Sequence, residues 1–205
     1  MDGAPQVAIP GIPAALRWES PPGDWKLRPD GALRITAGPR TDLFIDPDGE
    51  SPAVLNAARL IAGPIVGDFI LSARVTVDFA ATYDAGVLLI WADDETWAKL
   101  CFEYSPRGEP MIVSVVTRGV SDDCNSTVVD ASVTWLRISR RGRAYAFHSS
   151  ADGETWQLVR HFALPVSDAV SIGFEVQSPT GEGCSVTFDR ITFEARTLAD
   201  IRSGE

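Results

Sequence analysis

Apolar and polar residues alternate along several stretches of this chain, most clearly between residues 69 and 79. Apolar side chains occupy every second position there, from Phe69 to Phe79, and polar residues such as Ser72 and Arg74 fall between them. A period of two places one side of a segment on a core and the other side in water. The pattern is typical of a half-buried antiparallel strand.

The same rhythm predicts many short strands, with turn-forming Pro, Asp and Gly residues between them. Such a series indicates an all-β sandwich or barrel. At 205 residues the chain fits one domain, with a core over about 14–195 and a short C-terminal tail at 196–205. The predicted strands lie near residues 14–19, 25–28, 32–36, 42–45, 69–79, 85–92, 97–104, 111–118, 128–131, 135–141, 144–150, 156–162, 169–177 and 184–195.

The first of two predicted hairpins joins strands 97–104 and 111–118. A turn centred on residues 107–108 predicts that Trp97 lies opposite Arg118. With that register, Val113 and Val115 face the core and Arg118 shares the solvent side with Trp97.

The second predicted hairpin joins strands 135–141 and 144–150 through Gly142-Arg143, which suits a two-residue turn with Gly first. Arg137 is then opposite His148. If all these strands belong to one sheet, its solvent side carries a shared set of aromatic, charged and polar side chains. The set is Trp91, Trp97, Lys99, Glu103, Arg118, Trp135, Arg137, His148, Glu175 and Gln177.

This set predicts a ligand-binding face. Aromatic planes offer apolar surface for sugar rings, and charged side chains bind hydroxyl or carboxylate groups. A sugar or sugar acid would stack on Trp91 or Trp135. The alternative is that loops cover the tryptophans and the charges form an ordinary solvated sheet surface.

The chain resembles a known family in four stretches: YDAGVLL at residues 83–89, DDETWAK at 93–99, EY at 103–104 and VVTRGVSD at 115–122. They are similar to the domain-of-unknown-function 1349 family of bacterial and fungal proteins, which takes a name from a fungal protein called a regulator of enolase. The resemblance implies an antiparallel two-sheet β-sandwich (jelly roll) of the concanavalin A-like lectin/glucanase kind, similar to the accessory sandwich of some β-xylosidases. It implies no settled activity.

Composition limits the partners. The formal net charge is −10 and the sequence pI is about 4.6, so nucleic acid and anionic membranes are unfavourable partners. We find neither a secretory signal pattern nor a run of 18 apolar residues, and the three cysteines are odd in number. These features predict a cytoplasmic protein with reduced thiols.

No catalytic motif is evident. The chain has two histidines and lacks the usual metalloprotease, hydrolase and nucleotide-binding patterns. Glu103 and Glu175 are candidates for a glycosidase carboxyl pair. No cofactor is predicted, although Asp84, Asp93 and Asp94 are candidates for calcium ligands.

Three functions therefore remain open. The first is a non-catalytic β-sandwich that binds a carbohydrate or another small polar ligand on one sheet face. The second is a protein-interaction or regulatory module that binds a protein partner or forms a homodimer through the same aromatic residues. The third is a glycoside hydrolase that uses Glu103 and Glu175.

Overall fold

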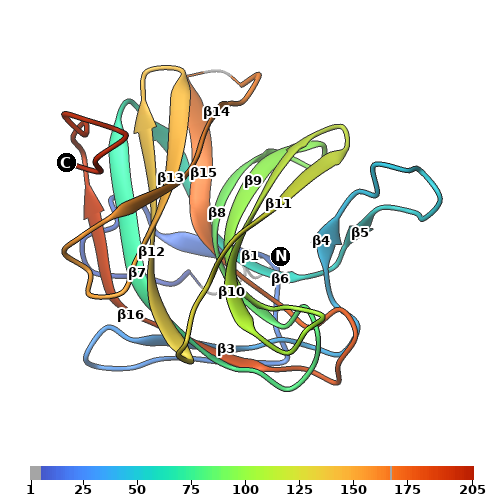
Figure 1. Ribbon diagram of the computed structural model, residues 1–205. Coiled ribbons are helices and arrows are strands. Elements are labelled where there is room, and N and C mark those ends of the chain that lie inside the picture. Colours follow the sequence, from blue (N-terminus) through green and yellow to red (C-terminus); the bar gives the residue numbers. More distant parts are fainter. Residues whose placement is uncertain (1–5, 167) are drawn as a thin grey trace, which may run out of the picture.

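A computed structural model describes residues 6–166 and 168–205. Two seven-stranded antiparallel sheets face each other as a sandwich, as Figure 1 shows, and the described residues contain no α-helix. The predicted all-β sandwich is confirmed. Within the same residues, no helix has the length and apolar character needed to cross a membrane.

One sheet, here called sheet A, includes both strands of the first predicted hairpin. Its outer face is the side turned away from the second sheet. In spatial order it contains β1 (Leu16–Ser20), β6 (Ala58–Val66), β15 (Ala169–Gln177), β8 (Ala85–Asp93), β9 (Thr96–Tyr104), β10 (Pro110–Arg118) and β11 (Ser121–Val128).

The other sheet, sheet B, includes both strands of the second predicted hairpin. Arg137 pairs with His148 in the predicted register. In spatial order sheet B contains β14 (Gln157–Ala163), β13 (Ala144–Ser150), β12 (Val133–Arg141), β7 (Phe69–Asp78), β16 (Ser185–Glu194), β3 (Leu33–Thr36) and β2 (Asp24–Leu27).

The main core fills the space between the sheets. Alternate side chains of the paired strands point inward, as the period of two predicts, and they join one buried cluster. Phe174 of sheet A lies against Phe188 of sheet B with ring centroids 4.9 Å apart. Removing one such side chain from water contributes about 1.5–3 kcal/mol to folding.

The register predicted for β9 and β10 is wrong by one residue. Thr117, not Arg118, pairs with Trp97. A shift of one residue moves every side chain of a strand to the other side of the sheet. Val113 and Val115 therefore lie on the outer face, where they join small satellite clusters instead of the main core.

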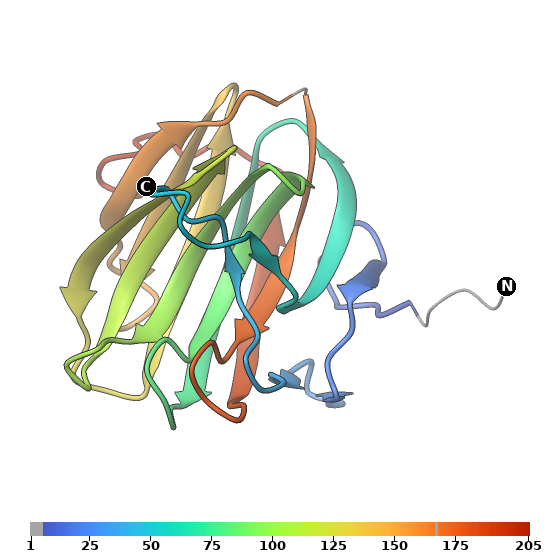
Figure 2. The ribbon, with the colours of Figure 1, turned by 90° about the vertical axis from the view of Figure 1, so that its right-hand side faces the viewer.

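Two segments of irregular chain cover parts of the outer faces. The β4–β5 segment (residues 41–57) contains the short strands β4 (Leu43–Phe44) and β5 (Val54–Leu55). Figure 2 shows it in front of the strands of sheet A. The C-terminal segment (residues 198–205) lies beside sheet B, on the side away from sheet A (Figure 1). These two segments determine which outer side chains reach solvent.

Candidate functional site

The predicted binding residues do not share one surface, so the prediction of a single platform is wrong. Alternation assigns a residue to a face of its own sheet, but it does not tell which strands share a sheet. Arg118 is exposed at the end of β10, 3.9 Å from Asp122. The outer face of sheet A carries Trp91, Trp97, Lys99, Glu103, Glu175 and Gln177, whereas that of sheet B carries Trp135, Arg137 and His148.

Trp91 and Trp97 are covered rather than exposed. The exposed fraction is 8% for Trp91 and 0% for Trp97. Both pack in a satellite cluster with Leu43 and Ala57 of the β4–β5 segment. The guanidinium of Arg59 also lies 4.7 Å from the centroid of the Trp91 ring. The structure therefore does not favour the predicted stacking of a sugar on Trp91. It supports the alternative, in which a loop covers Trp91 and Trp97.

Lys99 is buried beside these tryptophans and carries a charge. Its Nζ donates a 2.8 Å hydrogen bond to Oε1 of Gln177 and lies 3.6 Å from Oδ1 of Asp42. Burial by itself would lower the pKa of Lys99, but the surrounding carboxylates, led by Glu175, outweigh it and raise the pKa overall. The ammonium group is thus held in place by fixed acceptors.

Two glutamates in the same region have perturbed acidity. Burial raises the pKa of Glu103 to about 8 and that of Glu175 to about 7, in each case against the attraction of Lys99. Neither carboxylate oxygen of Glu175 has a hydrogen-bond partner in the described part of the chain. Burial also raises the pKa of Asp123. Perturbed acidity of this kind concentrates at functional sites.

These groups surround a hollow of about 280 Å³ on the outer face of sheet A, here called the sheet A hollow. Glu175 is fully buried and is not among its lining residues. The lining side chains combine one ammonium group, one amide, three carboxyl groups and two aromatic rings. They belong to Asp42, Phe44, Tyr83, Lys99, Glu103, Val115, Asp123 and Gln177.

Four polar or aromatic residues of this hollow were not predicted as ligand contacts. Asp42 and Phe44 come from the β4–β5 segment, which is distant in sequence from β9. Asp123 belongs to β11, a polar edge strand without alternation. Tyr83 follows a turn and has a backbone φ of 69°, and its place at the start of the family-like stretch at 83–89 is the one signal that marked it.

Two of the candidate calcium ligands, Asp84 and Asp93, accept hydrogen bonds from the protein itself. The carboxylate of Asp84 accepts hydrogen bonds from Ser178 Oγ at 2.6 Å and from the backbone N–H groups of Ala80 and Ala81. Asp93 accepts one from the N–H of Glu95 at 3.0 Å. In the described ranges, no three His, Cys, Asp or Glu side chains are grouped so that they would hold a metal ion. Asp84 and Asp93 stabilise turns through these bonds.

On sheet B, the C-terminal segment contacts two of the predicted binding residues. Arg137 Nη2 donates to the carbonyl of Gly204 at 2.7 Å, and its guanidinium lies 4.1 Å from the Trp156 ring centroid. His148 Nε2 lies 2.7 Å from the carbonyl of Ile201. Burial lowers the pKa of His148 to about 4, so the neutral ring donates its Nε2–H to that carbonyl.

Comparison with known families gives one match along most of the chain. The model of the family described as "Protein of unknown function (DUF1349)" matches residues 18–196. No curated protein matches the sequence.

Solved structures share the fold. A functionally unknown protein from Saccharomyces cerevisiae is 26% identical, with a TM-score of 0.81, over 89% of this chain and 97% of that one. A GH43 protein from Bacillus licheniformis is 16% identical, with a TM-score of 0.66, over 85% of this chain and 35% of that one. The carbohydrate binding module CBM66 from Bacillus subtilis is 14% identical, with a TM-score of 0.56, over 86% and 94%. The last two likenesses establish the sandwich fold alone.

Proposed function

The chain belongs to the DUF1349 family of proteins of unknown function, and from its geometry we propose that it is a non-catalytic module that binds a small carbohydrate in the sheet A hollow. The observation that carries this proposal is the hydrogen bond between two buried polar side chains, Lys99 and Gln177, which both line the hollow. This bond fixes both groups before any ligand arrives, which lowers the entropic cost of binding.

The chemistry of the lining suits a polyhydroxylated ring. Lys99 offers N–H donors, and Glu103 and Asp123 offer oxygen acceptors, so hydroxyl groups on several sides of a ring find partners. The rings of Phe44 and Tyr83 provide apolar surface for the C–H face of a sugar. A volume of about 280 Å³ lies near the lower end for small-molecule sites, which favours one or two sugar units.

The fold relatives support a carbohydrate ligand at a coarser level. They include a carbohydrate binding module and glycoside hydrolases. A β-sandwich that binds carbohydrate is consistent with this set, and the hollow is our proposal for where such binding takes place in this chain.

The geometry does not favour hydrolysis by Glu103 and Glu175. A glycosidase needs both carboxyl groups to reach one scissile bond. Glu103 lines the hollow, but Glu175 is fully buried and does not line it. Glu175 is better explained as a buried carboxyl group that raises the pKa of Lys99 through its charge, without a direct hydrogen bond.

Protein interaction through the sheet A tryptophans is likewise not favoured. Hot spots for partners contain aromatic residues that reach the partner's surface. Trp97 is fully buried by the chain's own β4–β5 segment. A partner would have to displace that segment before it touched the ring.

Calorimetric titration with neutral sugars tests the proposal. The panel contains pentoses, hexoses and their short neutral oligomers, and the variants are Tyr83→Ala and Asp123→Asn. We expect at least one sugar to bind, and each substitution to weaken it about tenfold, which corresponds to about 1.4 kcal/mol. Tyr83 is 40% exposed, Asp123 lies on the exposed strand β11, and neither belongs to the main core, so the fold should survive.

Arg118→Gln is the matched control, because Arg118 is exposed on the same sheet but does not line the hollow. It should bind the sugar as the unaltered protein does. The proposal fails if no neutral sugar binds, or if both hollow variants bind as tightly as the control.

A further inference from the structure

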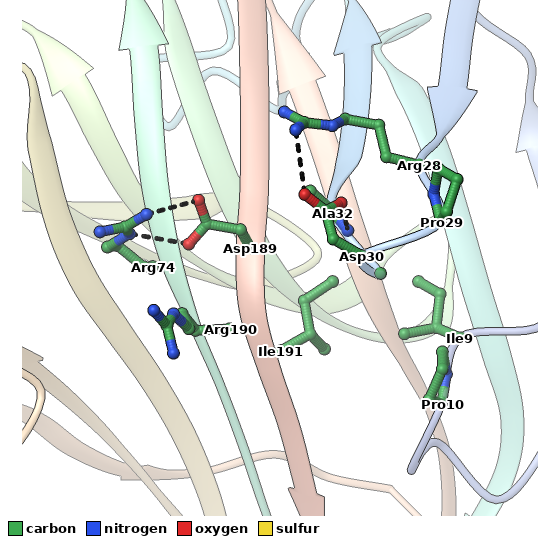
Figure 3. A pocket seen from close by; sticks show the side chains of 11 residues that line it. Ile9, Pro10, Arg28, Pro29, Asp30, Ala32, Arg74, Asp189, Arg190 and Ile191 are labelled. Carbon is green, nitrogen blue, oxygen red and sulfur yellow. Dashed lines mark hydrogen bonds and ion pairs between the residues drawn. The ribbon is translucent and has the colours of Figure 1, made fainter.

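The outer face of sheet B has two adjoining hollows that the proposed function does not use. One, of about 620 Å³, is lined in part by Arg28, Arg74 and Ile191. The other, of about 440 Å³, is lined in part by Trp135 and Trp156. Arg190 and Ile191 line both hollows, so the two adjoin along β16, and we call them together the sheet B groove. Figure 3 shows the side chains of the first hollow.

A β-bulge in β16 places Arg190 in this groove. Asp189 pairs with Arg74 and Thr192 pairs with Ser72, so the register shifts between them. Arg190 lies inside the shift with a φ of 50°, a conformation that few residues other than glycine adopt. Bulges often redirect a side chain next to a binding site. Here the bulge leaves the Arg190 guanidinium exposed in the groove.

The groove is lined by more arginine side chains than carboxyl groups, although the formal net charge of the whole chain is −10. Each acidic side chain in the lining already pairs with an arginine: Arg28 with Asp30 at 2.9 Å, Arg74 with Asp189 at 2.7 Å, and Arg196 with Glu194 at 2.6 Å. Figure 3 draws the first two of these pairs as dashed lines. Arg137 and Arg190 remain without a carboxylate partner in the described part of the chain. The groove therefore contains two guanidinium groups whose positive charge is available to an anion.

Aromatic and hydroxyl groups accompany these arginines. Trp135 and Trp156 line the second hollow, and the Arg137 guanidinium lies against Trp156 at 4.1 Å. The hydroxyl groups of Ser72 and Thr192 lie 2.7 Å apart in the same hollow. Indole surface next to hydroxyl groups suits a sugar ring, whereas a guanidinium suits a carboxylate through two parallel hydrogen bonds.

We propose that the sheet B groove is a second binding site, specific for an acidic saccharide of the hexuronate class. Arg190 pairs with the carboxylate, Arg137 adds positive charge beneath it, and the sugar ring lies against the indole surface of the second hollow. An acidic peptide offers the same charge but no ring of hydroxyl groups. The combination of arginine with tryptophan and hydroxyl groups therefore favours the saccharide.

The test compares four probes by calorimetry at low and at physiological salt: a hexuronate tetramer, a neutral hexose tetramer, a glutamate oligomer and inorganic phosphate. The variants are Arg190→Gln, with Arg118→Gln as the matched control, because both arginines are exposed and Arg118 lies on the other sheet. We expect the hexuronate to bind tighter than the other probes, and Arg190→Gln to weaken it about tenfold. Binding should also weaken as salt rises.

The proposal is overturned if Arg190→Gln binds the hexuronate as the unaltered protein does, or if Arg118→Gln weakens it equally. It is also overturned if the glutamate oligomer or phosphate binds as tightly as the hexuronate, because charge alone then explains binding. Tyr83→Ala separates the two sites. It should weaken binding of neutral sugar in the sheet A hollow and leave hexuronate binding unchanged, so each proposal can fail without the other.

Discussion

The two outer faces of this sandwich carry opposite arrangements of charge. On sheet A, carboxyl groups are crowded around a buried ammonium group under the β4–β5 segment, and two glutamates have raised pKa values. On sheet B, arginines line a groove in which acidic partners are fewer. Both faces are the outer sides of seven-stranded antiparallel sheets. The difference shows that the covering segment, rather than the strand pattern, decides what an outer face can bind.

Burial also changes the energetic role of each charge. Lys99 is 2% exposed and faces several carboxylates, of which that of Glu175 is fully buried. Arg137 is also buried, but its hydrogen bond goes to the neutral carbonyl of Gly204. Removing a buried charge is most costly when an opposite charge is left behind without a partner. The two faces should therefore respond differently to loss of a cation.

The largest expected effect is that of Lys99→Met. The substitution leaves buried carboxylates unpaired, and we expect a loss of about 3–5 kcal/mol in the free energy of unfolding. For a chain of this length that corresponds to a fall of roughly 10 °C in Tm. Thermal unfolding at a pH above about 8, where Glu103 and Glu175 are both ionised, measures it.

Arg137→Met is the comparison on sheet B. It removes a charged hydrogen bond and the contact with Trp156 but leaves no unpaired carboxylate, so we expect a loss of about 1.5–3 kcal/mol. An equal or greater loss for Arg137→Met would contradict the contrast between the faces.

Glu103 should make the stability of the fold depend on pH. Burial raises the pKa of its carboxyl group from 4.5 to about 8. The folded state then binds this proton more tightly than the unfolded state. Its contribution to stability is complete below pH 4.5 and is lost as the pH rises toward 8. Glu103→Gln removes this dependence, so its Tm should decline less over that interval than the Tm of the unaltered protein. Identical pH profiles for the two proteins would show that Glu103 titrates normally.

The smallest expected effect has the opposite sign and lies on sheet B. Burial lowers the pKa of His148 from 6.5 to about 4, so the unfolded state binds the proton more tightly. The stability of the folded state should then decrease as the pH falls from 6.5 toward 4. In His148→Gln this component is absent, which thermal unfolding across that interval measures. NMR titration of the ring provides a direct check, and a pKa near 6.5 for His148 would contradict the burial argument.

The sequence predicted the strands whose two sides differ. The strand at 69–79 and the hairpin at 135–150 were identified, and the pairing of Arg137 with His148 is confirmed. The strands β5, β6 and β11 were missed, the last two for opposite reasons. Most of β6 is buried on both sides and β11 is exposed along nearly its whole length, so neither alternates. The strand predicted near 128–131 shares only Val128 with β11.

The candidate site was predicted in part. Lys99, Glu103 and Gln177 do line one hollow. Most residues of β10 are buried on both of its sides, so its alternation has no readable phase. The predicted centre of the turn lies half a residue too far along the chain, which shifts the pairing by one residue. Asp42 and Phe44 reach the hollow from a segment that lies more than fifty residues before Lys99 in the sequence. No local pattern marks such a contact.

The order of polar and apolar residues by itself determined that this chain folds as an antiparallel sandwich, because strand alternation is a local property that burial of one side enforces. Only the tertiary structure decided which strands share a sheet and which outer side chains are covered. Those properties depend on pairing between distant segments and on where the β4–β5 and C-terminal segments lie. For that reason the residues predicted to share one surface lie on two. The outer face of sheet A carries carboxyl groups around a buried lysine, and that of sheet B carries arginines.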